Sequence, residues 1–294
     1  MKAAPFAYSR PADVDEACAL LAADEDARII AGGQTLVPMM AMRLARPARL
    51  IDISRIAALS FIREASGHLA IGAATRQCAV ERDRAVASKV PLLAAAVPWI
   101  GHAATRARGT VGGSLANGDP AAELALVAVT LDARLAFRKA RQDGEIAAAD
   151  FFLGPTVTAL PAAACLTGIR FPIWSEGRVG VGFYEVSARR SDFAFVSAAA
   201  QVALDADGIC RRAAIGIGAT TDAPFRLHGI EQALTGQRPE PANLRPAIEA
   251  ALADVEVNAD LHASAAYRRR VAATLALRAI ADACDSAKRG THAG

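Results

Sequence analysis

Hydrophobic and polar positions in the first third of the chain follow short patterns that alternate between helical and extended spacing. After Asp13, apolar residues recur on one face of a helix, and Asp13 with Glu16 has the spacing of a capping box. Brief apolar runs at 28–31 and 50–53 predict strands, and a helix is predicted between them at 36–44. This segment therefore predicts a small β–α–β unit.

The middle of the chain is predicted to form a mainly antiparallel sheet. Apolar runs flank Ser66-Gly67 and Asp143-Gly144, and both dipeptides favour tight turns, so each pair of runs predicts a β-hairpin. A further strand is predicted at 165–171.

Helix caps predict where the helices of this middle part begin. Thr75 is expected to cap a polar helix, and Pro91 is expected in the first turn of an apolar helix at 91–100. Asp119 and Pro120 have the residue types of an N-cap and a first helical position, so another helix is predicted to begin there.

The last third of the chain has longer apolar runs, and the change falls near residues 172–178. Strands are predicted at 180–186, 193–204 and 209–218, and helices follow from residue 230 onward.

These patterns predict an α+β fold. We expect an N-terminal domain at 1–175, divided into subdomains of about 1–56 and 57–175. A C-terminal domain at 176–288 is expected to pack a three-stranded antiparallel sheet against helices, and residues 289–294 are expected to form a tail.

Charge and composition exclude several classes of partner. The 33 basic and 30 acidic residues give a net charge of +3, which is too balanced to indicate binding to nucleic acid or insertion into a membrane. The basic cluster Arg268–Arg270 has no aromatic residues within it, so we interpret it as a solvated helix face or a subunit contact. Aromatic residues make up only 5% of the chain, so the core must be built from small aliphatic side chains.

Cysteine and histidine spacing predicts no metal site and no catalytic acid–base or nucleophilic constellation on this chain. The five cysteines are scattered and never have CxxC spacing, and the five histidines form no HxxxH or HExxH motif. We expect these cysteines to be reduced. The sequence also shows no signal peptide and no apolar run of transmembrane length, so we expect a cytoplasmic location.

Two glycine-rich segments, 31–36 and 110–114, are the candidate site. They are rich in glycines and hydroxyl residues, and exposed backbone amides in such segments suit phosphate oxygens. Neither has the GxGxxG of a dinucleotide-binding fold or the GK[ST] of a P-loop. Taken alone, each is better explained as an ordinary turn; together they suggest two walls of one cleft.

Five stretches, in order along the whole chain, carry a family resemblance. AGGQTL at 31–36 and TRARGTVGGSLANGDPAAEL at 105–124 are followed by LTGIRFP at 166–172, FYEVSARRSDFA at 183–194 and DLHASAAYR at 260–268. The chain resembles the FAD-binding (medium) subunit of molybdenum hydroxylases, the group of xanthine dehydrogenase and carbon monoxide dehydrogenase. The resemblance implies a PCMH-type FAD-binding fold and an oxidoreductase.

The resemblance also implies a cofactor and partners. Non-covalent FAD on this chain would accept electrons from [2Fe–2S] clusters on a small partner subunit, while a large partner subunit carries the molybdenum cofactor, as a dimer of heterotrimers. Carried over by position, the FAD-binding residues are Ile30, Ala31, Gly32, Gly33, Gln34, Thr35, Leu36, Ile100, Thr105, Thr110, Gly112, Gly113, Ser114, Asp119, Glu123, Leu166 and Glu185. Asp119 is equally explained as a helix cap, and Leu166 as a core residue.

Departures from the family pattern leave two alternatives open. Glu185 stands where members that use NAD⁺ often have lysine, so the final electron acceptor is not implied. A self-sufficient FAD oxidoreductase of the same fold, with His102 as the one candidate for covalent attachment, is one alternative. A nucleotide-binding scaffold subunit that has lost FAD is the other.

Overall fold

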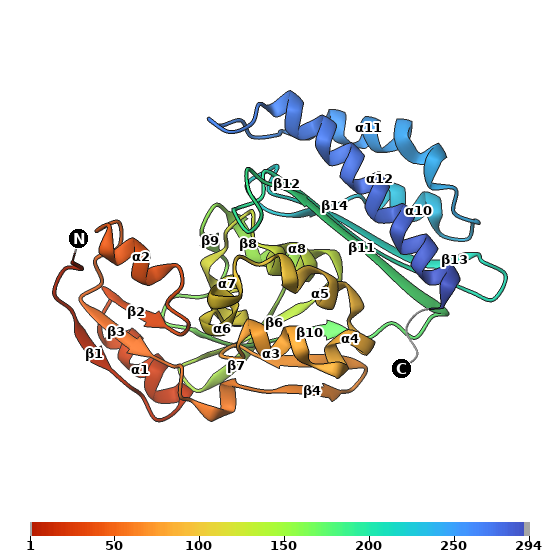
Figure 1. The fold of residues 1–294 in the computed structure, drawn as a ribbon. Coiled ribbons are helices and arrows are strands. Elements are labelled where there is room, and N and C mark those ends of the chain that lie inside the picture. The colour runs from red at the N-terminus through yellow and green to blue at the C-terminus, as the bar shows by residue number, and fades with distance from the viewer. Residues whose placement is uncertain (1, 291–294) are drawn as a thin grey trace.

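The N-terminal part forms a small parallel sheet at one end of the molecule (Figure 1). The computed structural model describes residues 2–290, and within them this sheet has the strand order β1-β3-β2. Its strands are β1 (Ala7–Ser9), β2 (Ala27–Ile30) and β3 (Arg49–Asp52), with helices α1 (Val14–Ala23) and α2 (Leu36–Ala41).

The capping box predicted for the first helix is present. The Asp13 carboxylate accepts a hydrogen bond from the Glu16 amide at 2.8 Å, and the Glu16 carboxylate accepts one from the Ala12 amide at 2.6 Å. The second helix ends at Ala41, earlier than residue 44, because Arg43 takes a left-handed conformation with φ 61°.

A five-stranded antiparallel sheet forms the centre of the middle part of the chain, in the order β4-β5-β10-β6-β7. Its strands are β4 (Ile62–Ala65), β5 (His68–Gly72), β6 (Arg134–Lys139), β7 (Gln142–Ala147) and β10 (Cys165–Pro172). A separate ribbon pairs β8 (Phe152–Gly154) with β9 (Val157–Thr158).

One of the two predicted hairpin turns is in a different place. The Ser66-Gly67 turn is confirmed, and both residues have positive φ. The second turn lies at Ala140-Arg141, and Asp143 and Gly144 belong to β7. Gly144 pairs with Phe137, whose ring occupies the space that a Cβ at position 144 would need. This glycine therefore serves cross-strand packing and not a turn.

Seven helices connect these strands within the described residues. They are α3 (Gln77–Arg82), α4 (Arg84–Lys89), α5 (Pro91–Ala96), α6 (Ala103–Arg108), α7 (Val111–Asn117), α8 (Glu123–Thr130) and α9 (Ala148–Phe151). Short 3-10 turns occupy Ala57–Leu59 and Val97–Trp99. The apolar helix predicted to begin at Pro91 is confirmed as α5.

Two predicted helix starts are wrong. Thr75 is buried, and its hydroxyl bonds both backbone polar groups of Phe61, so it caps no helix; the N-cap of α3 is Arg76. Asp119 accepts from the Ala121 amide at 2.9 Å in a local turn, and α8 begins only at Glu123.

The C-terminal part is a four-stranded antiparallel sheet whose own helices lie on one face, while α5 and α8 lie on the other (Figure 1). Its strands are β11 (Arg178–Val186), β12 (Val196–Leu204), β13 (Cys210–Gly218) and β14 (Phe225–Arg226). The helices are α10 (His228–Leu234), α11 (Arg245–Ala253) after a 3-10 turn at Pro241–Leu244, and α12 (Ala265–Arg289). The sequence predicts three strands for this sheet, and the structure has a fourth, the short edge strand β14.

β12 is buried along its whole length because each of its faces is covered. Val196, Ala198, Ala200, Val202 and Leu204 pack into the core under α12. Ala199 and Ala203, on the opposite face, pack into the main core that α5 and α8 share with the central sheet.

The domain limits proposed from the sequence stay a prediction, and the main core contains residues from both sides of residue 175. Of the predicted tail, Arg289 ends α12 and Gly290 is its C-cap, whereas residues 291–294 lie outside the described part.

Gly182→Ala is expected to lower the free energy of unfolding by about 1–3 kcal/mol, the usual cost of forcing extra volume into a packed core. A Cβ at this position would overlap the Ala279 carbonyl oxygen and lie 2.8 Å from its carbon, so β11 and α12 would have to separate. Chemical denaturation measures this. Gly229→Ala is the control, because a Cβ there meets nothing within 4 Å; equal stability of the two variants would contradict the prediction.

Candidate cofactor site between two glycine segments

The first glycine segment follows β2 and presents a row of free backbone amides. Within residues 2–290, the amides from Ala31 to Thr35 donate no hydrogen bond, while the Gly33 carbonyl accepts from Val37 at 3.0 Å. Gly33 has φ 69°, which turns the chain sharply toward α2. Successive free amides of this kind form a concave surface that suits phosphate oxygens.

The second glycine segment is helical, which differs from the turn expected from its sequence. Thr110 is the N-cap of α7, and its hydroxyl accepts from the Gly113 amide at 3.1 Å. The amides of Val111 and Gly112 donate to the Thr75 and Ala73 carbonyls at 3.0 and 2.8 Å. The amides expected to hold a phosphate are therefore already used, so the segment offers the exposed surface at Gly113 and the Ser114 hydroxyl instead.

The first segment touches, through its backbone, the connection that leads into the second segment. A Cβ on Gly32 would overlap the Arg108 carbonyl oxygen and lie 2.9 Å from the Gly109 Cα. The backbone amide of Gln77 donates to the Gly109 carbonyl at 2.9 Å, and the Arg76 guanidinium donates to the Arg108 carbonyl. These bonds fix the short connection between α6 and α7 against which Gly32 rests.

A paired arginine holds α6 in place beside this contact. The Arg106 guanidinium makes two hydrogen bonds to the Glu81 carboxylate at 2.8 and 2.9 Å, in the strong bidentate arrangement. It also donates to the carbonyls of Ile100 and Gly101 at 3.1 and 3.0 Å. The short helix is thereby fixed at both of its ends.

Two buried carboxyl groups, Glu123 and Glu185, lie near enough for the charge of the first to affect the second. Glu123 is the first residue of α8, and the turn before it is held by a 3.0 Å bond from the Ala219 amide to the Pro120 carbonyl. Burial, with a smaller effect of the Asp119 carboxylate, raises the pKa of Glu123 to about 7. Burial, and then the Glu123 carboxylate, raises the pKa of Glu185 to about 8.

Glu185 has a further unusual feature. Its Oε2 atom is buried and makes no hydrogen bond within the described residues. An orphaned buried carboxyl oxygen is costly unless a ligand completes it. The group therefore fits a binding position for a polar cofactor.

The remaining residues carried over from the family pattern lie at different distances from solvent. Ile30 and Leu36 are half-buried at the two ends of the first segment, and Thr105 is half-buried on α6. Ile100 is 8% exposed and Leu166 is 4% exposed, and both belong to the main core. Contact between Leu166 and a flavin ring stays a prediction, as do the other assigned contacts.

Within the described part of the chain, no group of three or more histidine, cysteine, aspartate or glutamate residues is arranged to hold a metal ion. Four of the five cysteines are buried, and burial raises the pKa values of Cys165 and Cys284 to about 12. Thiols of such high pKa are poor nucleophiles and metal ligands.

Residues 4–174 match the family model described as the FAD binding domain in molybdopterin dehydrogenase. Residues 182–283 match the CO dehydrogenase flavoprotein C-terminal domain. The chain belongs to the molybdenum hydroxylase flavoprotein subunits. The family expected from the sequence motifs is thus confirmed, together with the α+β fold, FAD as the cofactor and oxidoreductase as the class.

Individual relatives of this flavoprotein subunit cover nearly the whole chain. The nicotine 6-hydroxylase medium subunit of Paenarthrobacter nicotinovorans is 35% identical, over 96% of this chain and 99% of that one. The carbon monoxide dehydrogenase medium chain of Afipia carboxidovorans is 32% identical, over 96% and 98%. The structure of quinoline 2-oxidoreductase from Pseudomonas putida 86 superimposes with a TM-score of 0.92 at 33% identity, covering 98% and 99%.

The residues that support the connection between α6 and α7 could not be predicted from the sequence. Gln77 is 4% exposed, and a Cβ on Gly109 would lie 2.9 Å from its amide carbon. Arg106 and Glu81 are 25 residues apart in the chain. A single sequence carries no local signal for such long-range pairs, and only the helical spacing of α3 could have hinted that Gln77 points inward.

Gly32→Ala is expected to abolish retention of flavin during purification. The added Cβ would push the first segment away from Arg108 and Gly109, and the phosphate-binding surface would open. The flavin-to-protein absorbance ratio measures this. Gly154→Ala is the matched control, because a Cβ there meets nothing within 4 Å. Undiminished flavin in Gly32→Ala, with the fold intact, would refute the role of the contact.

Glu185→Gln is expected to make the flavin-free chain more stable than the native one at alkaline pH. The folded pKa of about 8 lies above the ordinary 4.5, so the folded state keeps a proton that the unfolded state releases. The free energy of unfolding therefore falls as pH rises from about 4.5 to 8. Glu185→Gln removes the contribution of Glu185 to this pH dependence, and the contribution of Glu123 stays.

Denaturation at pH 4 and pH 9 tests this difference. We expect the stability of Glu185→Gln relative to the native chain to be higher at pH 9 than at pH 4. Exposed Glu25 provides the control, as Glu25→Gln, and should change neither value. An unchanged pH dependence in Glu185→Gln would show that the carboxyl group ionises as freely as one in solution.

Proposed function

We propose that this chain binds FAD non-covalently across the two glycine segments and relays electrons from [2Fe–2S] clusters of a partner subunit to an external acceptor. The observation that carries the proposal is the first segment, whose amides are free and whose Gly32 rests against the connection between α6 and α7. A diphosphate bridge needs such a row of donors, and the residues there fit one.

The residues divide into a phosphate end and a ring end. The amides from Ala31 to Thr35 would hold the diphosphate, with the Ser114 hydroxyl beside them. Glu123 would accept hydrogen bonds from a ribose or ribityl diol. The orphaned Oε2 of Glu185 would complete its hydrogen bonding on the flavin ring, and with a pKa near 8 it can act as a donor at neutral pH.

The redox chemistry belongs to the cofactor, which when bound would supply the capacity to accept electrons one at a time and hold two of them. This chain supplies the binding surface, the orientation and the shielding of the ring. Substrate oxidation would occur at a molybdenum centre on the large partner subunit, and a dimer of heterotrimers is the assembly we propose. The relatives named above as medium subunits or chains support a multi-subunit complex.

The two alternative functions have less support. A self-sufficient enzyme would need its own acid or base, and His102, the one candidate for covalent attachment, is exposed at the start of α6. A scaffold without FAD would have no reason to keep five free amides and an orphaned carboxyl oxygen. No described helix is long and apolar enough to cross a membrane, and a cytoplasmic location stays a prediction.

An absorbance spectrum of the purified chain tests the proposal directly. A flavin spectrum excludes the scaffold, and substrate oxidation that requires co-expressed partner subunits excludes the self-sufficient enzyme. A chain without flavin after expression with its partners would overturn the proposal.

Glu123→Ala is expected to weaken FAD binding by about 1–3 kcal/mol, the usual cost of leaving buried hydrogen-bonding groups unmet. Titration of flavin-free chain with FAD, followed by quenching of flavin fluorescence, gives the affinity. Exposed Glu25 again provides the control, as Glu25→Ala. Unchanged affinity would assign Glu123 a structural role at the start of α8.

A further inference from the structure

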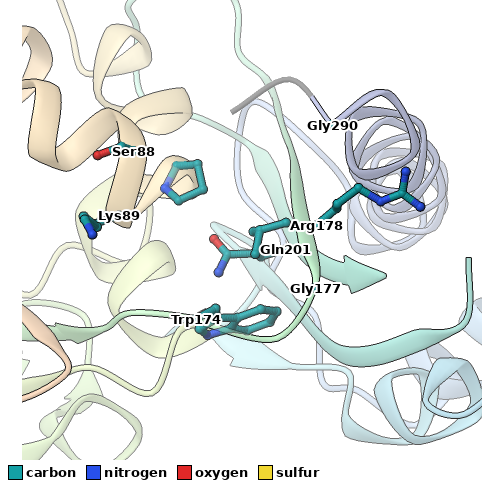
Figure 2. Close-up of a pocket in the computed structure, with 9 residues that line it drawn as sticks. Ser88, Lys89, Trp174, Gly177, Arg178, Gln201 and Gly290 are labelled. Carbon is teal, nitrogen blue, oxygen red and sulfur yellow. The ribbon is translucent and has the colours of Figure 1, made fainter. Parts of the chain in front are cut away.

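The two ends of α12 are held by different arginines. At the C-terminal end, the Arg178 guanidinium donates to one carbonyl of α12 and one of the turn after β12, at 3.3 and 3.1 Å. Figure 2 shows Arg178 beside a cavity of about 240 Å³, whose walls include Trp174, Gln201 and Gly290. Within the described chain, no residue assigned to the cofactor site lines this cavity. At the N-terminal end the arginine is Arg268, and its contacts lead toward that site.

Arg268 is buried, so the solvated helix face expected from the sequence is wrong for this residue. It is only 5% exposed. Its Nη1 atom donates to the carbonyls of Phe195 and Ala219 at 2.8 and 2.6 Å, and its Nη2 atom donates to the Asp260 carboxylate. A buried guanidinium is costly unless it is paired, and these charge-assisted bonds fix its position.

The partner carboxylate of Arg268 is itself held in place. Hydrogen bonds from the Ala263 and His262 amides, at 2.9 and 2.8 Å, and a further one from Arg268 lower the pKa of Asp260 to about 2. The carboxylate is therefore ionised at neutral pH. Asp260 and Arg268 are the first and last residues of the family motif at 260–268, for which the proposed FAD contacts supply no role.

The first carbonyl that Arg268 holds belongs to the chain beside Glu185. The Phe195 amide donates to the Val186 carbonyl at 2.7 Å, where the end of β11 meets the start of β12. Glu185 itself pairs with Ser197, two residues further along β12. Arg268 therefore fixes the start of the strand on which the backbone of Glu185 rests.

The second carbonyl belongs to Ala219, whose backbone is strained. Its φ of 62° lies in the left-handed region, which alanine rarely adopts. The Ala219 amide donates to the Pro120 carbonyl at 3.0 Å, in the turn that leads to Glu123, while its carbonyl accepts from Arg268. A strained conformation persists only where the surrounding contacts hold it. Arg268 therefore also fixes the segment that is bonded to the turn before α8.

We propose that Arg268 is a positioning residue for the ring end of the FAD site, because one guanidinium nitrogen joins the chain beside Glu185 to the chain bonded to the turn before Glu123. This role rests on the proposed function, in which both glutamates bind the cofactor. Arg268 acts through the backbone, since its bonds go to Phe195, Ala219 and Asp260. Without it, the ends of β11 and α8 would shift relative to one another, and a binding group must be held within about 0.5 Å of its productive position.

A double-mutant cycle with Glu185→Met tests this role. The affinity of the flavin-free, full-length chain for FAD is measured by quenching of flavin fluorescence. Arg268→Met removes every donor and is expected to weaken FAD binding about tenfold in the native chain. In the Glu185→Met background the same change is expected to cost less than about threefold, because the placement of an absent carboxyl group no longer matters. A purely structural role would cost the same factor in both backgrounds.

Arg269→Met is the matched control. Arg269 is the next residue of α12, and its guanidinium also donates to two backbone carbonyls, those of Leu252 and Val255, both at 2.9 Å. Its loss should lower the melting temperature, because α11 is then held less firmly against α12. The affinity for FAD should change by less than about twofold in either background.

Failure of the positioning role can be distinguished from failure of the proposed function. A native chain that binds no FAD, or Glu185→Met with native affinity, would overturn the proposed ring end and the role of Arg268 with it. If both behave as expected, an equal factor for Arg268→Met in the two backgrounds, or the same loss of affinity in Arg269→Met, would overturn the positioning role alone.

A second variant covers the case in which Arg268→Met does not fold. Arg268→Lys keeps the charge beside Asp260 but has a single nitrogen, so it cannot reach the carboxylate and both carbonyls together. We expect it to weaken FAD binding more in the native chain than in Glu185→Met, and an equal loss in both would overturn the proposal.

Discussion

The contact of Gly32 with the Arg108–Gly109 backbone is the constraint on which the proposed FAD site depends. It brings the segment after β2 against the connection before α7 without any intervening side chain, so the first segment lies beside the chain that leads into the second. Gln77 donates a hydrogen bond to Gly109, and Arg106 on α6 pairs with Glu81. In both cases the two bonded residues are distant in the sequence. A binding surface made of backbone is rigid only when such bonds fix the chain on both sides.

At the other end of the proposed site the main effect is the burial of two carboxyl groups. Burial raises the pKa values of Glu123 on α8 and Glu185 on β11, and a smaller effect comes from the Asp119 carboxylate on Glu123 and from the Glu123 carboxylate on Glu185. A fold keeps such a pair only when the surrounding packing is strong enough to bear its cost. That packing is visible in β12, which lies next to β11 and is buried on both faces. The buried strand β12 therefore supports β11, the strand that carries Glu185.

Much of the local structure could be predicted from the sequence because its causes are local. The Asp13–Glu16 capping box, the Ser66-Gly67 turn and the first turn at Pro91 each depend on residues within four positions of one another. The family motifs also located both glycine segments and the two glutamates. The errors arose where a residue of suitable type had a stronger distant partner. Thr75 bonds Phe61, and Gly144 faces Phe137, so neither plays the local role that its type suggests.

The sequence by itself determined the family, the class of fold, the cofactor and the positions of the residues proposed to hold it. Only the tertiary structure decided which amides are available, because a hydrogen-bond donor is free or used according to acceptors far away in the chain. The amides of Val111 and Gly112 are taken by Thr75 and Ala73, whereas those from Ala31 to Thr35 are not taken within the described residues. The cavity lined by Trp174 and Gln201 likewise exists only where four segments distant in the sequence meet.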